Sequence, residues 1–210
     1  MNIQFDKVQP KNKAQLKSLI EYAFNHNIYD LNFIDTSKIT DMSKLFMSCE
    51  YDFDVSSWDV SNVTNMSQMF DFCVNFNCDL SGWDVSNVKN MCQIFYGCTR
   101  LNTDLSIWNV SNVTDMNHMF FCCENFDIKC FESWDVSNVT DMTSMFAFCN
   151  KFDCDLSNWD VSNVTGMYYM FGHCKQFDCD LSRWNTSKVK DMKNMFTGCN
   201  RLTIPDWYKK

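Results

Sequence analysis

The chain has 210 residues, a formal net charge of −8 and no run of lysine or arginine that forms a basic stripe. This charge balance excludes nucleic-acid binding through phosphate contacts. No apolar stretch approaches the ~20 residues that a membrane span needs, so we expect no membrane-spanning helix. Hydrophobic residues make up 46% of the chain, which excludes the composition of a disordered protein.

The first predicted element is an N-terminal capping segment, residues 1–32, built around an amphipathic helix. Pro10 and Asn12 suit the start of that helix. Four apolar residues follow at the spacing of one helical face: Leu16, Leu19, Ile20 and Ala23. The segment 1–10 lacks a basic stretch followed by an apolar one, so we expect no secretory signal and a cytoplasmic location.

Residues 33–200 contain the phrase Trp-Asp-Val-Ser-Asn-Val, or a close variant of it, six times. Its tryptophans lie 25, 25, 26, 25 and 25 residues apart, at Trp58, Trp83, Trp108, Trp134, Trp159 and Trp184. A fixed period of this size is typical of a solenoid, in which one coil of chain stacks on the next. We therefore expect about seven stacked repeats, closed by a truncated C-terminal cap over residues 201–210.

One short parallel strand and one short helical segment are expected in each repeat, which makes the fold class an α/β repeat solenoid. The helical segment is indicated by apolar residues three or four apart: Val63, Met66, Met69, Phe70 and Cys73. The strand is indicated by Phe76, Cys78 and Leu80, which alternate with polar residues.

Thirteen cysteines in a chain without a visible signal indicate reduced thiols. Seven of them form one column, interpreted as a ladder in the structural core: Cys49, Cys73, Cys98, Cys123, Cys149, Cys174 and Cys199. Metal binding and disulfides are the alternatives. Metal sites need tight local ligand pairs, and a column of seven cannot pair completely. We therefore expect no metal, no cofactor and a structural role for the column.

The outward positions of the expected strands carry a ladder of aspartates. This candidate partner-binding face comprises Asp54, Asp79, Asp104, Asp153, Asp155, Asp178 and Asp180. Like charges on neighbouring strands destabilise a sheet, so a cation, a basic partner or hydrogen bonds from serine and asparagine must offset them. The alternative is that these aspartates only form turns by bonding to nearby backbone. The segment Asp127–Lys129 interrupts the column.

Aromatic residues that differ from repeat to repeat mark a second candidate surface: Phe72, Tyr96, Phe121, Phe148, Tyr168 and Tyr169. Such residues either anchor a partner or fill gaps between coils. No catalytic motif is present. His118 and His173 lack an adjacent nucleophile, so we interpret them as structural or solvated and expect no enzyme activity.

The repeated motif W-D-V-S-N-V-T-(D/N)-M-x-x-M-F-x-x-C-x-x-F-(N/D)-x-D-L-S resembles the BspA-type leucine-rich-repeat family over residues 33–207. That family includes a repeat domain of unassigned function, common in surface proteins of mycoplasma and other bacteria. The resemblance implies a right-handed, leucine-rich-repeat-like coil and a role in binding. Secreted members are associated with adhesion.

Three functions follow as hypotheses. The first is a non-enzymatic interaction scaffold that presents its repeat surface to a protein partner with basic residues. The second is a surface or secreted adhesin of the BspA type. The third is a structural solenoid that binds cations through the aspartate ladder. The sequence leaves the partner's identity and the oligomeric state open.

Overall fold

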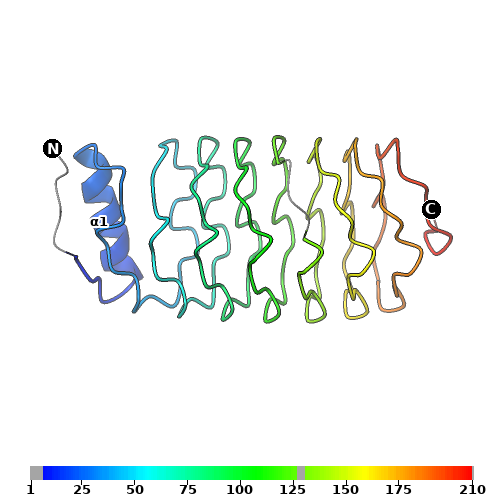
Figure 1. Ribbon diagram of the computed structural model, residues 1–210, viewed down its shortest axis with the longest axis horizontal. Helices are drawn as coiled ribbons and strands as arrows, with labels where there is room; N and C mark the ends of the chain where they lie inside the picture. Colours follow the sequence, from blue (N-terminus) through cyan, green and yellow to red (C-terminus); the bar gives the residue numbers. More distant parts are fainter. Residues whose placement is uncertain (1–6, 127–130, 210) are drawn as a thin grey trace.

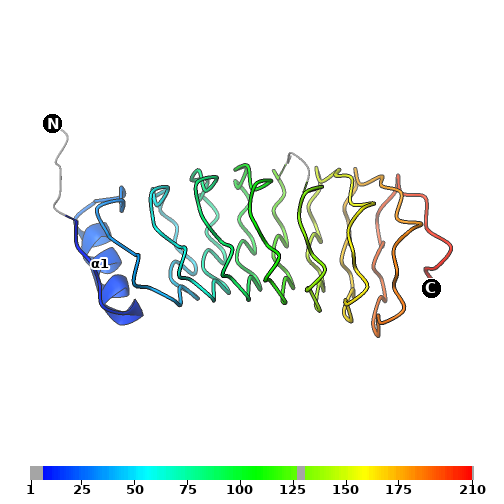
Figure 2. The ribbon, with the colours of Figure 1, turned by 60° about the horizontal axis from the view of Figure 1, so that its bottom comes forward.

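The repeated segments form successive coils that stack along one axis, with the two termini at opposite ends (Figures 1 and 2). The structure, a computed structural model, describes residues 7–126 and 131–209. Isolated parallel β-bridges join equivalent residues of neighbouring coils. We number the coils 1 to 7 by these bridge residues, in the order Asp41, Asn65, Asn90, Asp115, Asp141, Gly166 and Asp191.

One end of the stack is closed by the helix α1, Lys13–Asn25 (Figure 1). The side chain of Asn12 caps it by accepting the backbone N–H of Gln15 at 3.0 Å. The apolar face of α1 is buried in the common core through Leu16, Ile20 and Ala23. The helix that the spacing of apolar residues indicated is therefore present.

The short helical segment expected in each repeat is absent from the described residues. In coil 2 the segment 63–73 is a run of turns instead. Gln68 and Phe72 have φ of +58° and +55°, a left-handed conformation that no α-helix accommodates. The backbone N–H groups of alternate residues therefore point to the next coil. The donors are Met66, Gln68, Phe70 and Phe72, and the carbonyls of Asn90, Cys92, Ile94 and Tyr96 accept at 2.7–2.9 Å.

The segment that was expected to form a strand has the predicted alternation but no strand hydrogen bonding. Phe76, Cys78 and Leu80 are buried, whereas Asp79 is exposed. The backbone N–H of Leu80 donates to Oγ1 of Thr103 in the next coil, at 3.2 Å. Because a side chain takes the place of a backbone carbonyl, no β-ladder forms here.

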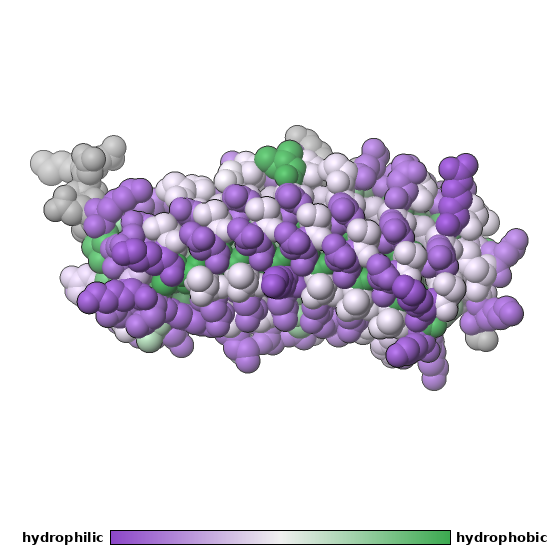
Figure 3. All heavy atoms as spheres, turned by 90° about the horizontal axis from the view of Figure 1, so that it is seen from below, coloured by the Kyte–Doolittle hydropathy of each residue, from purple (hydrophilic) through white to green (hydrophobic). Residues whose placement is uncertain are grey.

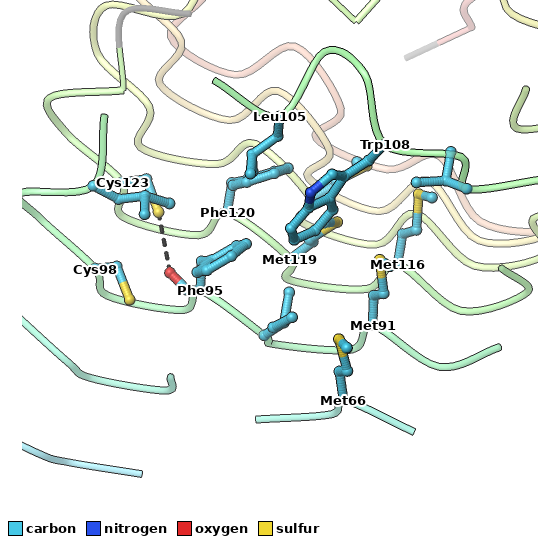
Figure 4. Packing of buried hydrophobic residues seen from close by; sticks show 14 of the residues in the cluster. Met66, Met91, Phe95, Cys98, Leu105, Trp108, Met116, Met119, Phe120 and Cys123 are labelled. Atoms are coloured by element: carbon cyan, nitrogen blue, oxygen red, sulfur yellow. Dashed lines mark hydrogen bonds between the residues drawn. The ribbon is translucent and has the colours of Figure 1, made fainter. Parts of the chain in front are cut away.

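Stacked side chains fill the centre of the coils (Figure 4). Phenylalanine rings of successive coils lie nearly parallel, with centroids 5.6–5.9 Å apart, in the order Phe46, Phe70, Phe95, Phe120, Phe146, Phe171 and Phe196. Methionines at equivalent positions pack beside them, as Met66, Met91 and Met116 show. The core is thus one continuous column rather than a set of separate clusters.

The repeated tryptophan phrase ties each coil to an earlier one. The indole Nε1 of Trp108 donates to the carbonyl oxygen of Leu80 at 3.0 Å. Within the same phrase, the side-chain amide of Asn112 donates to the carbonyl of Ser86 at 2.7 Å. The carboxylate of Asp84 accepts the N–H of Ser86 at 3.0 Å and so fixes the turn. The phrase is therefore scaffolding.

Candidate functional site

The seven aspartates of the candidate partner-binding face lie on one side of the extended segments, and we call this side the acidic face. Asp104 is half-buried and the other six are exposed. Five of them hold a turn, because their Oδ1 atom accepts the backbone N–H of the serine two residues later at 2.8–3.0 Å: Asp54, Asp79, Asp104, Asp155 and Asp180. The carboxylates are therefore both exposed and fixed in orientation.

These hydrogen bonds keep the carboxylates ionised. The backbone N–H of Ser81 lowers the pKa of Asp79, although the charges of Asp104 and Asp54 oppose that shift. The backbone N–H of Ser182 likewise lowers the pKa of Asp180. Neighbouring carboxylates are thus close enough to repel one another electrostatically, and together they give the face a negative potential.

Two surface hollows are lined by six of the seven aspartates of the acidic face. One, of about 410 Å³, contains Asp54 and Asp79. The other, of about 560 Å³, is lined by Asp153, Asp155, Asp178 and Asp180, beside the cation of Arg183. The interruption expected at Asp127–Lys129 lies outside the described residues.

The geometry offers no metal centre in residues 7–126 and 131–209, where no three His, Cys, Asp or Glu side chains are grouped to hold an ion. Carboxylate oxygens bond to backbone instead. Asp153 Oδ1, for example, accepts the N–H of Asp178 at 3.2 Å.

The seven-cysteine column lies in or beside the core. From coil 2 onward each thiol donates to the carbonyl of a phenylalanine in the preceding coil at 2.9–3.0 Å, and the donors are Cys73, Cys98, Cys123, Cys149, Cys174 and Cys199. Cys49 is half-buried in coil 1. Burial raises the pKa of Cys73 to about 12, so its thiol is unreactive at neutral pH. The cysteines of the described residues are free thiols.

The variable aromatics meet in a continuous row, which we call the aromatic ladder. Its ring centroids lie 4.7–5.9 Å apart from one coil to the next, in the order Phe72, Tyr96, Phe121, Phe148 and Tyr169, with Tyr168 at 5.9 Å from Tyr169. The rings pack on one another, yet Phe72 is 52% and Tyr168 39% exposed. The ladder thus both fills space between coils and offers apolar surface.

Two histidines also belong to the ladder, which the sequence reasoning missed. The ring of His173 stacks on Phe148 at 4.9 Å, and His118 lies 5.5 Å from Phe121. Burial lowers the pKa of His118. A signal for part of this packing was present in the sequence: a small residue lies next to some of the large ones, as Gly172 does before His173 and Gly97 after Tyr96.

Asp71 is a further residue that the sequence reasoning missed. It is 7% exposed, and its Oδ1 has no hydrogen-bond partner among the described residues. Burial raises the pKa of this carboxyl, although the charge of Lys44 opposes the shift. The equivalent positions of other coils hold uncharged residues such as Tyr96 and Ala147. Asp71 is therefore an exception within a repeated environment.

Side chains of one kind recur in rows along the stack. Figure 3 shows one side of the molecule, where hydrophilic residues form rows with narrow apolar strips between them. A protein-family model described as "Mycoplasma protein of unknown function, DUF285" matches residues 14–131 and 115–208. The chain belongs to this family.

The two DUF285 matches together extend from α1 to coil 7 and beyond it to Tyr208. No curated protein and no solved structure matches the chain. Among the described residues of this DUF285 member, no helix has both the length and the apolar character to cross a membrane.

Proposed function

We propose that this chain is a non-enzymatic binding module whose acidic face receives basic residues of a protein partner. The observation that carries the proposal is the repeated carboxylate geometry. Asp79, Asp155 and Asp180 hold equivalent positions, and a serine N–H fixes one oxygen of each. All three side chains are exposed, so a partner can reach their carboxylates.

Fixed carboxylates favour binding because little conformational freedom is lost when a partner arrives. Arginine and lysine donate strong, charge-assisted hydrogen bonds to such oxygens. The 560 Å³ hollow around Asp155 and Asp180 is wide enough to admit such side chains. The partner chemistry that fits is therefore a segment with several spaced basic residues.

Asparagine replacement tests this proposal without disturbing the turns. The change is Asp79, Asp104, Asp155 and Asp180 to Asn. In this chain Asn109 and Asn185 already accept the N–H of a following serine at 3.2 Å, so asparagine keeps the turn and removes the charge. We expect proteins retained by the unchanged chain from native lysate to be lost, and their retention to weaken with salt.

A matched control uses the turn phrase on another part of the coil. Asp59, Asp84 and Asp160 accept the same serine N–H bonds at 3.0 Å, so their change to Asn removes three charges elsewhere. We expect this variant to retain the partner. Equal binding by both variants and the unchanged chain would contradict a role of the acidic face in binding the partner.

The finer assignment to the BspA type, with a right-handed leucine-rich-repeat-like coil, is also a proposal. It is supported by the length and repetition of the tryptophan phrase, and an experimental structure tests it. A cytoplasmic location is proposed from the free, hydrogen-bonded thiols. Cell fractionation tests this location against the adhesin alternative. A surface-exposed fraction would favour the adhesin.

A further inference from the structure

The hydrogen bonds between coils have a direction. Between every two neighbouring coils, four backbone N–H groups of the earlier coil donate to carbonyls of the later coil, at 2.6–3.1 Å. One carbonyl of the earlier coil accepts in the other direction, as that of Thr40 does from the N–H of Thr64; the carbonyls of Thr140 and Thr165 each accept a second, longer bond at 3.4 Å. In backbone-to-backbone bonds, each coil therefore presents four donors and one acceptor on its C-terminal side, and the complementary set on its N-terminal side. Side chains of the later coil, such as Cys123 and Asn112, add donors that bond back to carbonyls of the earlier coil.

The C-terminal side of coil 7 has no full coil against it in the described residues, although the rings of Trp207 and Tyr208 pack on Phe196, with centroids 6.1 and 5.0 Å away. The N–H groups of Met192, Asn194, Phe196 and Gly198 occupy the donor positions there and donate to no acceptor in the part of the chain that is described. They lie along a hollow of about 670 Å³ that is also lined by Tyr208. We call this row of donors the C-terminal edge.

The opposite side of coil 1 holds the complementary row. The carbonyls of Asp41, Ser43, Leu45 and Met47 accept no backbone hydrogen bond within residues 7–126 and 131–209. The helix α1 covers this row, and the Lys13 ammonium bonds to the side chains of Asp41 and Ser43 at 3.1 and 2.6 Å. We call the row the coil 1 edge.

Few structures fit the C-terminal edge. An ordinary β-strand shows N–H and C=O groups alternately on one side, so half of its groups would set donor against donor. Two C-terminal edges facing each other would do the same along their whole length. A single small anion satisfies only part of a row of four donors. The matching occupant is a row of carbonyls two residues apart, which is what the N-terminal side of a coil presents.

We propose that the C-terminal edge of one copy binds the coil 1 edge of a second copy, head to tail, and that α1 blocks this contact. The new interface would repeat the one that occurs six times within the chain. Its core residues match as well. Met192 would lie over Met42, and Phe196 over Phe46 once the rings of Trp207 and Tyr208 move aside, as equivalent residues do throughout the stack. Such a heterologous contact does not close on itself, so it produces filaments.

Displacing α1 tests the proposal in the full chain. The variant Leu16→Asp, Ile20→Asp places two charges on the buried face of the helix. The milder variant Lys13→Glu sets a like charge against Asp41 and leaves the core intact. We expect the unchanged chain to remain at 24.8 kDa in light scattering. Both variants should gain mass with concentration, to at least about twofold. The matched control Ala14→Asp, Ser18→Asp changes exposed positions of the same helix and should stay at one chain.

A second change separates specific filaments from aggregation. Met192→Pro removes one donor of the C-terminal edge and sets a ring against an arriving coil. Added to either α1 variant, it should return the mass to one chain. A chain with intact α1 has a covered coil 1 edge, so it should bind variant filaments at one end only and shorten them. The same chain with Met192→Pro should not shorten them. The proposal would be overturned if the α1 variants stay at the mass of one chain while their coils melt at an unaltered temperature. It would also be overturned if the α1 variants still assemble when they carry Met192→Pro.

Discussion

The thiol of Cys123 donates a hydrogen bond to the carbonyl oxygen of Phe95, with 3.0 Å between Sγ and O (Figure 4). The same carbonyl accepts the backbone N–H of Cys98 at 3.1 Å. One oxygen thus closes the turn of its own coil and holds the next coil. This double use gives the recurring cysteine a structural role. Among the described residues, these cysteines are free thiols and belong to no group that could hold a metal ion.

Replacing Cys123 with alanine should lower the free energy of unfolding by about 1–2 kcal/mol, because a buried hydrogen bond and some packing are lost. The Phe95 carbonyl keeps its backbone donor, which limits the cost. Urea unfolding measures the change. Cys92→Ala, at a half-buried thiol, is the control and should cost less. Equal losses in both variants would contradict a special role for the column.

Trp108→Phe should destabilise the fold by about 1–2 kcal/mol, since it removes the indole donor 3.0 Å from the carbonyl of Leu80 and leaves that carbonyl only the backbone N–H of Trp83 at 3.1 Å. Trp207 makes the same bond to Leu181 at 2.8 Å but is only half-buried in the last coil. Trp207→Phe should therefore cost less, because water can reach the released carbonyl. Thermal unfolding of both variants checks this order, and a reversed order would count against it.

Gly97→Ala should be destabilising by about 1 kcal/mol or more. Gly97 has φ of +69°, and an added Cβ would lie 2.9 Å from Cδ1 of Phe72. Gly82 is the control, since nothing lies within 4 Å of its added Cβ. Gly82→Ala should be neutral or slightly stabilising, because alanine restricts the unfolded chain. Melting temperatures of the two variants measure the contrast. Similar values would show that the Phe72 ring moves away from the added Cβ at little cost.

Asp71→Ala should stabilise the protein at neutral pH by about 1–2 kcal/mol, because it removes a buried carboxylate oxygen without a partner. Ala147 fills the equivalent position of coil 5 and is fully buried, so alanine fits there. The control is Asp52→Ala at an exposed site, where little change is expected.

The gain from Asp71→Ala should depend on pH. The folded pKa of Asp71 lies above its ordinary value of 3.8, so the folded state binds the proton more tightly. The unchanged chain therefore loses stability as pH rises from 3.8 through the folded pKa. The variant's advantage should be largest above that pKa and vanish below 3.8. Urea midpoints across this range test the sign, and an advantage that grows in acid would refute it.

Much of the coil's interior could be predicted from residue spacing. The alternation of Phe76, Cys78 and Leu80 with polar residues correctly indicated which side chains are buried. Six of the seven cysteines in the column are buried in the core, and Cys49 packs beside it. For the variable aromatics, spacing left two interpretations open, partner anchors or fillers of gaps between coils, and their ring contacts from coil to coil agree with the second. These successes share a cause: burial of apolar side chains acts position by position, so a period reveals it.

Backbone conformation was predicted less well. Spacing of three and four residues in segment 63–73 indicated a helix, but turns with left-handed residues at Gln68 and Phe72 produce the same spacing. Their N–H groups bond to a coil about 25 residues away, for example Gln68 to Cys92 at 2.8 Å. No local sequence pattern indicates a hydrogen bond between residues that far apart in the chain. Asp71 was missed for a related reason, because its cost depends on what the neighbouring coils place around it.

The uniform direction of the bonds between coils gives the stack an electrical axis. Peptide groups aligned in one direction add their dipoles, as they do in an α-helix, with the positive end where N–H groups emerge. Here four groups per coil point towards the C-terminal end, against one in the opposite direction. A chain of net charge −8 thus carries a positive pole at coil 7, where Lys190 and Lys193 add to it. The molecule should orient in an electric field along its length, independently of its aspartates.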